Sequence, residues 1–358
     1  MRNRPIGAAI YGVDLGKNRF DVVACDAMGK PVQRLKLTRH SLLPFFGQVG
    51  KALIGMEACP GAQWLARKLS EMGHSVRIIP AQFVKPFVKS NKNDARDAEA
   101  IVEALIRPTM RFVEVKSTAQ LDLQALHRIR DRIVANRTQL ICQIRAFCLE
   151  YGVAIRQGTG MFKIEIASII ADETNDLTPM MRALLKELWN EFQAVDTRLA
   201  IITRNVEALA ARNETARRLM TIPGVGPIAA TALLAAIGNG RQFRKARDLA
   251  AWLGLVPRQS STGGKTTLLG ISKRGNPYVR RLIIPGHDPA SLTSIVSATS
   301  LAAGSIGLRR GCIETRSSLQ WPTRLLGSRG PFSRDQARST NGLIRRTPDQ
   351  PLGNNCGV

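Results

Sequence analysis

Histidine and cysteine are scarce in this chain of 358 residues, and their spacing excludes several kinds of site. The six cysteines include no C-x-x-C pair and no neighbouring histidines, so neither a zinc site nor a disulfide framework is predicted. Only four histidines are present, which disfavours a histidine triad or metal cluster. No apolar run approaches the roughly 18–20 residues of a membrane helix. The first five residues, Met1–Pro5, lack the apolar core of a secretory signal. We therefore expect a cytoplasmic protein whose chemistry uses carboxylates, hydroxyls or lysines.

The acidic residues are also few, because 52 Lys and Arg face 27 Asp and Glu, which gives a net charge of +25. Such an excess points to a polyanionic partner, most often nucleic acid, although it can also serve solubility alone. Ten of the basic residues, with a single acid, lie between Arg241 and Arg281. A hydrophobic fraction of 44% is ordinary for a globular protein, and the length predicts two or three domains.

Residues 8–114 alternate strand and helix signals. Three apolar strands come first, and helices then alternate with two further strands, which favours a mixed α/β sheet of the ribonuclease H-like order over an all-parallel one. Ser41 is the expected N-cap of the first helix. The expected strands are 8–16, 20–26, 32–37, 52–57 and 76–79, and the expected helices are 42–49, 61–72 and 94–106.

Residues 115–213 contain two long helical stretches, 118–151 and 178–212, separated by a loop near Gly158–Gly160. Their apolar stripes predict an antiparallel or intermolecular coiled coil, or else two core helices of a compact bundle. If they pair between chains, a homodimer or tetramer follows. Residues 214–284 form a third, mainly α-helical unit.

The string Ile222–Pro227 reads Ile-Pro-Gly-Val-Gly-Pro and precedes a small-residue helix. This pattern is typical of a helix-hairpin-helix element, in which glycines let backbone N–H groups meet a phosphate. The same string can also merely link two packed helices. The residues predicted to contact nucleic acid are Gly224, Gly226, Arg258, Lys265, Lys273 and Arg274.

Four carboxylates stand out. Asp14 and Glu57 each end an apolar strand, and Asp94 and Asp97 share one face of a helical first turn. Each also has a simple structural explanation. Asp94 can cap the helix, and Asp97 can interact favourably with the positive end of the helix dipole. Together they predict a shared site for Mg²⁺ or Mn²⁺, which prefer hard oxygen ligands.

Several motifs in order along residues 8–284 closely resemble the DEDD-type insertion-sequence transposases, relatives of the Piv DNA invertases with a RuvC-like N-terminal domain. The motifs are Gly12–Asp14, Met56–Gly61, Lys92–Ala98, Ile222–Pro227, Ala251–Arg258, Ser261–Gly264 and Gly270–Gly275. The resemblance implies DNA strand cleavage and rejoining, with the four carboxylates as catalytic metal ligands. It further implies a guide RNA and a nucleophilic serine between Ser260 and Gly264. Counting from Ser272 favours Ser261, whereas counting from Pro257 favours Thr262, and Ser261 is preferred. Such a protein would be bacterial and associated with the nucleoid when bound to DNA.

The segment 285–358 differs in composition from the rest, because it contains no lysine. We expect an atypical tail here, either frameshifted near Ile284 or disordered. An inactive, nucleic-acid-binding transposase remnant is therefore the alternative function. A third hypothesis, a sugar-kinase-like or actin-like ATPase, rests on the turn at Asp14–Lys17, but no second phosphate loop or adenosine motif accompanies it.

Overall fold

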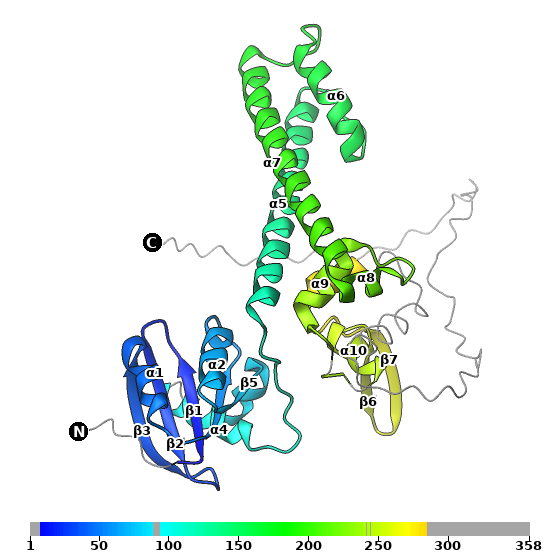
Figure 1. Cartoon of the computed structure of the whole chain (residues 1–358). Coiled ribbons are helices and arrows are strands. Elements are labelled where there is room, and N and C mark those ends of the chain that lie inside the picture. The colour runs from blue at the N-terminus through cyan, green and yellow to red at the C-terminus, as the bar shows by residue number, and fades with distance from the viewer. Residues whose placement is uncertain (1–7, 89–93, 241, 244, 285–358) are drawn as a thin grey trace, which may run out of the picture. The chain divides into compact units, whose positions relative to one another are not determined.

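The N-terminal region of the computed structural model, which describes residues 8–88, 94–240, 242–243 and 245–284, is a five-stranded mixed sheet (Figure 1). The strand order is β3-β2-β1-β4-β5. Strands β1, β2 and β3 form an antiparallel meander, and β4 and β5 run parallel to β1. The predicted mixed α/β sheet is confirmed. The strands are β1 (Ile10–Leu15), β2 (Arg19–Cys25), β3 (Pro31–Thr38), β4 (Leu53–Glu57) and β5 (Ser75–Ile79).

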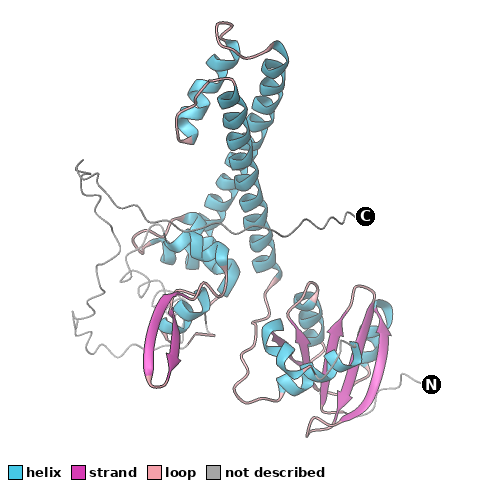
Figure 2. Cartoon of the chain, turned by 180° about the vertical axis from the view of Figure 1, so that it is seen from behind, coloured by secondary structure: helices cyan, strands magenta, loops and turns pink. Residues whose placement is uncertain are grey.

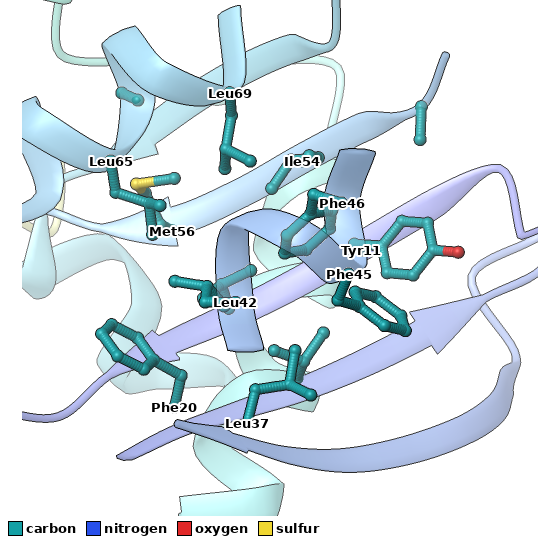
Figure 3. Close-up of a cluster of buried hydrophobic side chains, with 14 of the residues drawn as sticks. Tyr11, Phe20, Leu37, Leu42, Phe45, Phe46, Ile54, Met56, Leu65 and Leu69 are labelled. Carbon is teal, nitrogen blue, oxygen red and sulfur yellow. The ribbon is translucent and has the colours of Figure 1, made fainter. Parts of the chain in front are cut away.

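One face of this sheet is covered by α1 (Arg39–Gly47) and α2 (Ala62–Glu71). Figure 3 shows the side chains that fill this layer, with Tyr11 and Met56 from the sheet facing Phe46 and Leu69 from the helices. The first helix is capped by Thr38, not by Ser41 as predicted. Ser41 instead occupies the N3 position, where its Oγ accepts a hydrogen bond from the Thr38 N–H, so the two residues form a capping box.

The opposite face of the sheet packs against α4 (Asp94–Leu105). A β carbon on Gly12 would overlap the carbonyl oxygen of Ala98, so only glycine lets this helix lie directly on β1. At the other end of α4, a β carbon on Gly29 would lie 3.0 Å from the Ile106 side chain, and Gly29 follows β2 near the start of β1. The helix therefore runs antiparallel to β1 and begins at its carboxyl end. A short α3 (Ala81–Val84) and the 3-10 turn Lys85–Phe87 precede it.

The middle region contains the long helices α5 (Thr118–Glu150) and α7 (Pro179–Arg212), which are close to their predicted bounds (Figure 2). They are antiparallel, because Arg137 on α5 bonds Asp196 on α7 whereas the earlier Arg130 bonds the later Thr203. The predicted loop near Gly158–Gly160 is present but ends at Gly158, which is the N-cap of an additional helix, α6 (Thr159–Ala171), that was not predicted. Among the described residues, no helix combines the length and the apolar character needed to cross a membrane.

The C-terminal region is mainly helical as predicted, but it also contains a two-stranded hairpin that the sequence did not reveal. A compact apolar cluster joins the helices, with Leu233 and Leu249 fully buried. The predicted tail, 285–358, lies outside the described residues. The elements are α8 (Glu214–Met220), α9 (Pro227–Ile237), α10 (Ala246–Leu253), β6 (Pro257–Thr262), β7 (Lys265–Ile271) and α11 (Pro277–Ile283).

Candidate active site and nucleic-acid interface

Asp14 and Glu57 occupy corresponding positions at the carboxyl ends of neighbouring parallel strands. The register pairs Val13 with Met56, so the next residue on each strand is one of the two acids. Side chains alternate between the faces of a sheet. Since Val13 and Met56 are buried on the α1 and α2 face, both carboxylates lie on the face covered by α4.

The first turn of α4 brings the other two predicted acids to the same edge. Ala98 contacts Gly12, which precedes Asp14 by two residues on β1. Asp94 and Asp97 lie before Ala98, over the carboxyl end of that strand. Asp97 is half-buried, whereas the side chain of Asp94 lies outside the described part of the chain. The backbone thus places all four predicted positions at one end of the sheet.

The pKa of the Cys59 thiol responds to the negative charge of the two strand-end carboxylates. Burial raises the pKa of Cys59, and the negative charges of Glu57 and Asp14 raise it further. A region of accumulated negative charge and hard oxygen donors suits a divalent cation. Within the described residues, however, no three side chains of His, Cys, Asp or Glu are already arranged to hold a metal ion.

Asp21 is a further acid at this edge that the sequence analysis missed. The antiparallel register places it directly opposite Asp14, so both side chains are on the α4 face. The Asp21 side chain is only 14% exposed, and its Oδ1 lies 3.9 Å from the Lys36 ammonium on β3. The sequence signal was the short turn between the first two strands. Leu15 pairs with Phe20 across this turn, so the next residues outward, Asp14 and Asp21, pair with each other.

Ser261 lies on strand β6, not in the loop expected from the sequence. Its Oγ accepts a hydrogen bond of 2.8 Å from Gln259 Nε2, and its residue pairs with Thr266 across the hairpin. Gly263 and Gly264 form the turn with positive φ angles of 56° and 79°. Because side chains alternate along a strand, Ser261 and Thr262 present their hydroxyls to opposite faces of the hairpin.

The base of this hairpin is a close backbone crossing. A β carbon on Gly254 would overlap the backbone of Arg274, and one on Gly275 would overlap the Trp252 carbonyl. Arg280 Nη1 donates to the carbonyls of Leu253 and Arg274, which joins the two segments. Trp252 is half-buried and packs against the C-terminal core.

Lys273 lies at this crossing with φ +53°, the only positive φ of a non-glycine residue in the described part of the chain. Its N–H donates to the Gly254 carbonyl. A left-handed lysine costs roughly 1–2 kcal/mol, so the surrounding contacts hold it there. The basic residues predicted to contact nucleic acid are exposed on this hairpin and the loop after it, namely Arg258, Lys265, Lys273 and Arg274.

The segment between α8 and α9 forms a tight turn, in which the Val225 N–H donates to the Ile222 carbonyl. Gly224 has φ +82°, a conformation that favours glycine. Gly226 is exposed at the start of α9 and a β carbon there would meet no atom within 4 Å, so folding itself does not require glycine.

His127 on α5 connects that helix to α9 and α11 through a buried hydrogen-bond chain. Its Nδ1 lies 3.0 Å from the Tyr278 hydroxyl, and its Nε2 lies 3.0 Å from Thr231 Oγ1. Thr231 donates its hydroxyl proton to the Pro227 carbonyl, so it accepts from His127 Nε2–H, and Nδ1 accepts from Tyr278. Burial lowers the pKa of His127 to about 4, with nearby Arg130 adding to the effect. The sequence signal for this buried contact was a single histidine within the apolar stripe of a long helix.

Comparison with known proteins decides the family. The sequence model of the Transposase IS116/IS110/IS902 family matches residues 216–294, and a transposase model of the IS110 DEDD type matches residues 11–152. A probable family 20 transposase of Pseudomonas aeruginosa is 45% identical over 276 residues, which cover 77% of this chain and 82% of that protein. The chain belongs to the IS116/IS110/IS902 transposase family.

Other relatives agree with this membership. The transposase for insertion sequence element IS1328 of Yersinia enterocolitica is 42% identical over 275 residues, covering 77% of this chain and 81% of the relative. The pilin gene-inverting protein of Moraxella bovis is 24% identical over 266 residues, covering 70% and 73%. The chain is thus a transposase, an enzyme of DNA cleavage and transfer in insertion sequences. The predicted resemblance is confirmed, and the kinase-like hypothesis is wrong because both family matches are transposases.

Proposed function

We propose that this transposase cleaves and rejoins DNA strands with a divalent-metal site and a serine nucleophile. The observation that carries the proposal is the convergence of two strand ends and one helix start at a single sheet edge. The proposed nucleophile is Ser261. The proposed metal ligands are Asp14, Glu57, Asp94 and Asp97.

The carboxylates would hold Mg²⁺ or Mn²⁺, which polarises a phosphodiester and stabilises charge on its attacking and leaving oxygens. Asp14 and Glu57 are fixed by the sheet, and Asp97 by the helix packed on Gly12. Such rigid placement keeps the ligands preorganised, so the site does not need to reorganise when a strand binds.

Ser261 would attack the phosphorus atom through Oγ. A bond from Oγ to phosphorus forms while the bond from phosphorus to a deoxyribose oxygen breaks; Oγ loses its proton and the departing oxygen gains one. The product is a phosphoserine link to DNA, and attack by another deoxyribose hydroxyl reverses the step and rejoins the strand. Gln259 orients the nucleophile because its amide donates to Oγ and leaves the hydroxyl proton directed elsewhere.

The C-terminal region would bind the phosphate backbone of the DNA. We assign α8, the Gly224–Gly226 turn and α9 as the helix-hairpin-helix element, with open space at Gly226 that suits close approach of a phosphate. The exposed cations of the hairpin and the following loop would contact further phosphates without reading sequence.

A guide RNA and self-association complete the proposal. The surplus positive charge accommodates an RNA in addition to DNA.

The long helices, proposed to form a coiled coil, expose apolar side chains. Pairing with a second copy would cover these side chains, as in a homodimer or tetramer. The most exposed are Leu149, Met180 and Ile201, at 63%, 75% and 50%.

The test is a covalent-adduct assay with the full chain, Mg²⁺ and duplex DNA from the ends of the element. A protein–DNA band that resists denaturation is expected, and peptide mapping should place the phosphate on Ser261. The Ser261→Ala variant should lose the adduct, while the matched Ser260→Ala variant keeps it. A phosphate mapped to Thr262 or no adduct at all would contradict the assignment.

The alternative, an inactive remnant that still binds nucleic acid, rests on the lysine-free composition of residues 285–358. It predicts no adduct from the natural chain. It also predicts that an adduct appears when residues 285–358 are replaced by the corresponding C-terminus of the Pseudomonas aeruginosa relative. Equal adduct yields from both chains would reject it.

A further inference from the structure

The turn that follows Asp14 is held in place by hydrogen bonds from Arg39. The guanidinium of Arg39, from the first turn of α1, donates to the Lys17 carbonyl through Nη2 at 2.9 Å and Nε at 3.3 Å. The Arg39 backbone N–H donates to the Asn18 carbonyl at 3.2 Å. Three hydrogen bonds from one residue therefore fix the path of this turn.

The same guanidinium also contacts two aromatic rings. Its central carbon is 5.7 Å from the ring centroid of Phe20 on β2 and 5.7 Å from that of Trp64 on α2. Both distances are within the range of a cation–π contact. The positive charge of Arg39 is therefore stabilised within the protein, by the Lys17 carbonyl and by the two ring faces.

The turn itself presents two exposed cations, Lys17 and Arg19. Neither forms an ion pair with any residue in the described ranges of the chain. Lys17 and Arg19 are therefore exposed cations close to the end of the sheet where the strand acids lie.

Arg19 also lies on the same sheet face as those acids. It precedes Asp21 by two residues on β2, and residues two apart on a strand project to the same side. Its Cα is therefore about 6–7 Å beyond the row formed by Asp21, Asp14 and Glu57. This separation matches the spacing between successive phosphates along an extended strand, so a strand crossing the acids would bring a neighbouring phosphate to Arg19.

We propose that Lys17 and Arg19 bind the phosphate backbone of the DNA strand that enters the carboxylate site, and that Arg39 is the residue that positions their turn. The inference rests on the proposed function for the location of the reacting phosphate. It assigns a second DNA contact to the transposase, on the catalytic sheet itself.

The test measures DNA affinity of the full chain against salt concentration, with EDTA present and an arbitrary 40-base-pair duplex as the probe. Each lost phosphate contact lowers the slope of log K against log[salt] by about one unit. The combined Lys17→Ala and Arg19→Ala variant should lower the slope by about two units. The matched control, Lys30→Ala with Lys51→Ala, removes the same charge from the other end of the sheet and should change it much less. An equal change in both variants, no change in the first, or a change seen only with a 40-nucleotide RNA probe would overturn the proposal.

A double-mutant cycle tests the role of Arg39. Arg39→Lys keeps the charge but loses the planar, multiply bonded contact with the turn. It should weaken DNA binding severalfold in the natural background and cause no further loss when Lys17 and Arg19 are already alanine. Equal losses in both backgrounds would mean that Arg39 is only structural.

Both measurements omit the metal and so do not depend on cleavage. If the covalent adduct fails to form while the salt slopes differ as expected, the proposed chemistry is wrong and the DNA contact stands. If the adduct forms and the slopes do not differ, the contact is wrong and the proposed chemistry stands.

Discussion

Asp14 on β1 lies directly opposite Asp21 on β2, so two carboxylates are neighbours on the sheet face that α4 covers. Glu57 extends the same row on the other side of Asp14. Like charges held this close repel each other, and a bound divalent cation relieves the repulsion.

Asp21→Asn should weaken cation binding without abolishing it. The substitution removes one nearby negative charge but leaves the proposed ligands in place, so affinity for Mn²⁺ should fall roughly tenfold, or about 1.4 kcal/mol. In the absence of metal the same variant should unfold at a slightly higher temperature, because repulsion with Asp14 is lost. Mn²⁺ titration and thermal unfolding measure both effects; an unchanged affinity would place Asp21 outside the site.

Lys273→Gly should stabilise the fold while it weakens DNA binding. Glycine adopts the left-handed conformation of Lys273 without strain, which should raise the free energy of unfolding by up to about 1 kcal/mol. Lys273→Ala is the matched control, since it removes the same charge and keeps the strain. Denaturant unfolding and DNA titration compare the two. Equal stability of the two variants would show that the backbone there is unstrained.

Gly226→Ala should separate DNA binding from folding. A β carbon at this position meets no atom within 4 Å and φ is −83°, so the unfolding free energy should stay within about 0.5 kcal/mol of the natural value. If a phosphate approaches the start of α9, the added methyl should reduce DNA affinity severalfold. Retained affinity would argue that this turn only links two packed helices.

His127 should make stability depend on pH. The folded-state pKa is about 4 and the ordinary value is 6.5, so between these values the unfolded chain binds more protons than the folded one. Stability should therefore fall as the pH is lowered from about 6.5 to about 4. His127→Gln should flatten this part of the profile in urea unfolding at several pH values. A profile unchanged by the substitution would assign the effect to other groups.

The sequence predicted the N-terminal sheet well because its strands are apolar and its helices are amphipathic. Asp14 and Glu57 were identified as polar ends of apolar strands, and their common edge follows from parallel pairing. Asp21 was missed because its closeness to Asp14 depends on the antiparallel register, which no single strand reveals.

The C-terminal hairpin was not predicted because both of its strands are exposed along their whole length. Without a buried side, the segment has no alternation of polar and apolar residues for a sequence pattern to detect. The helix α6 was missed for a different reason. Gly158 and Gly160 are usual loop residues, but here Gly158, with φ +96°, serves as the N-cap of that helix.

The most direct test of the account is an Mn²⁺ titration of the full chain followed by electron paramagnetic resonance. The account predicts saturable Mn²⁺ binding that Mg²⁺ displaces and that Asp14→Asn or Glu57→Gln abolishes, while Glu71→Gln on the distant surface of α2 leaves it intact. Binding of equal affinity in Asp14→Asn, Glu57→Gln and the natural chain would contradict a metal site at the ends of β1 and β4.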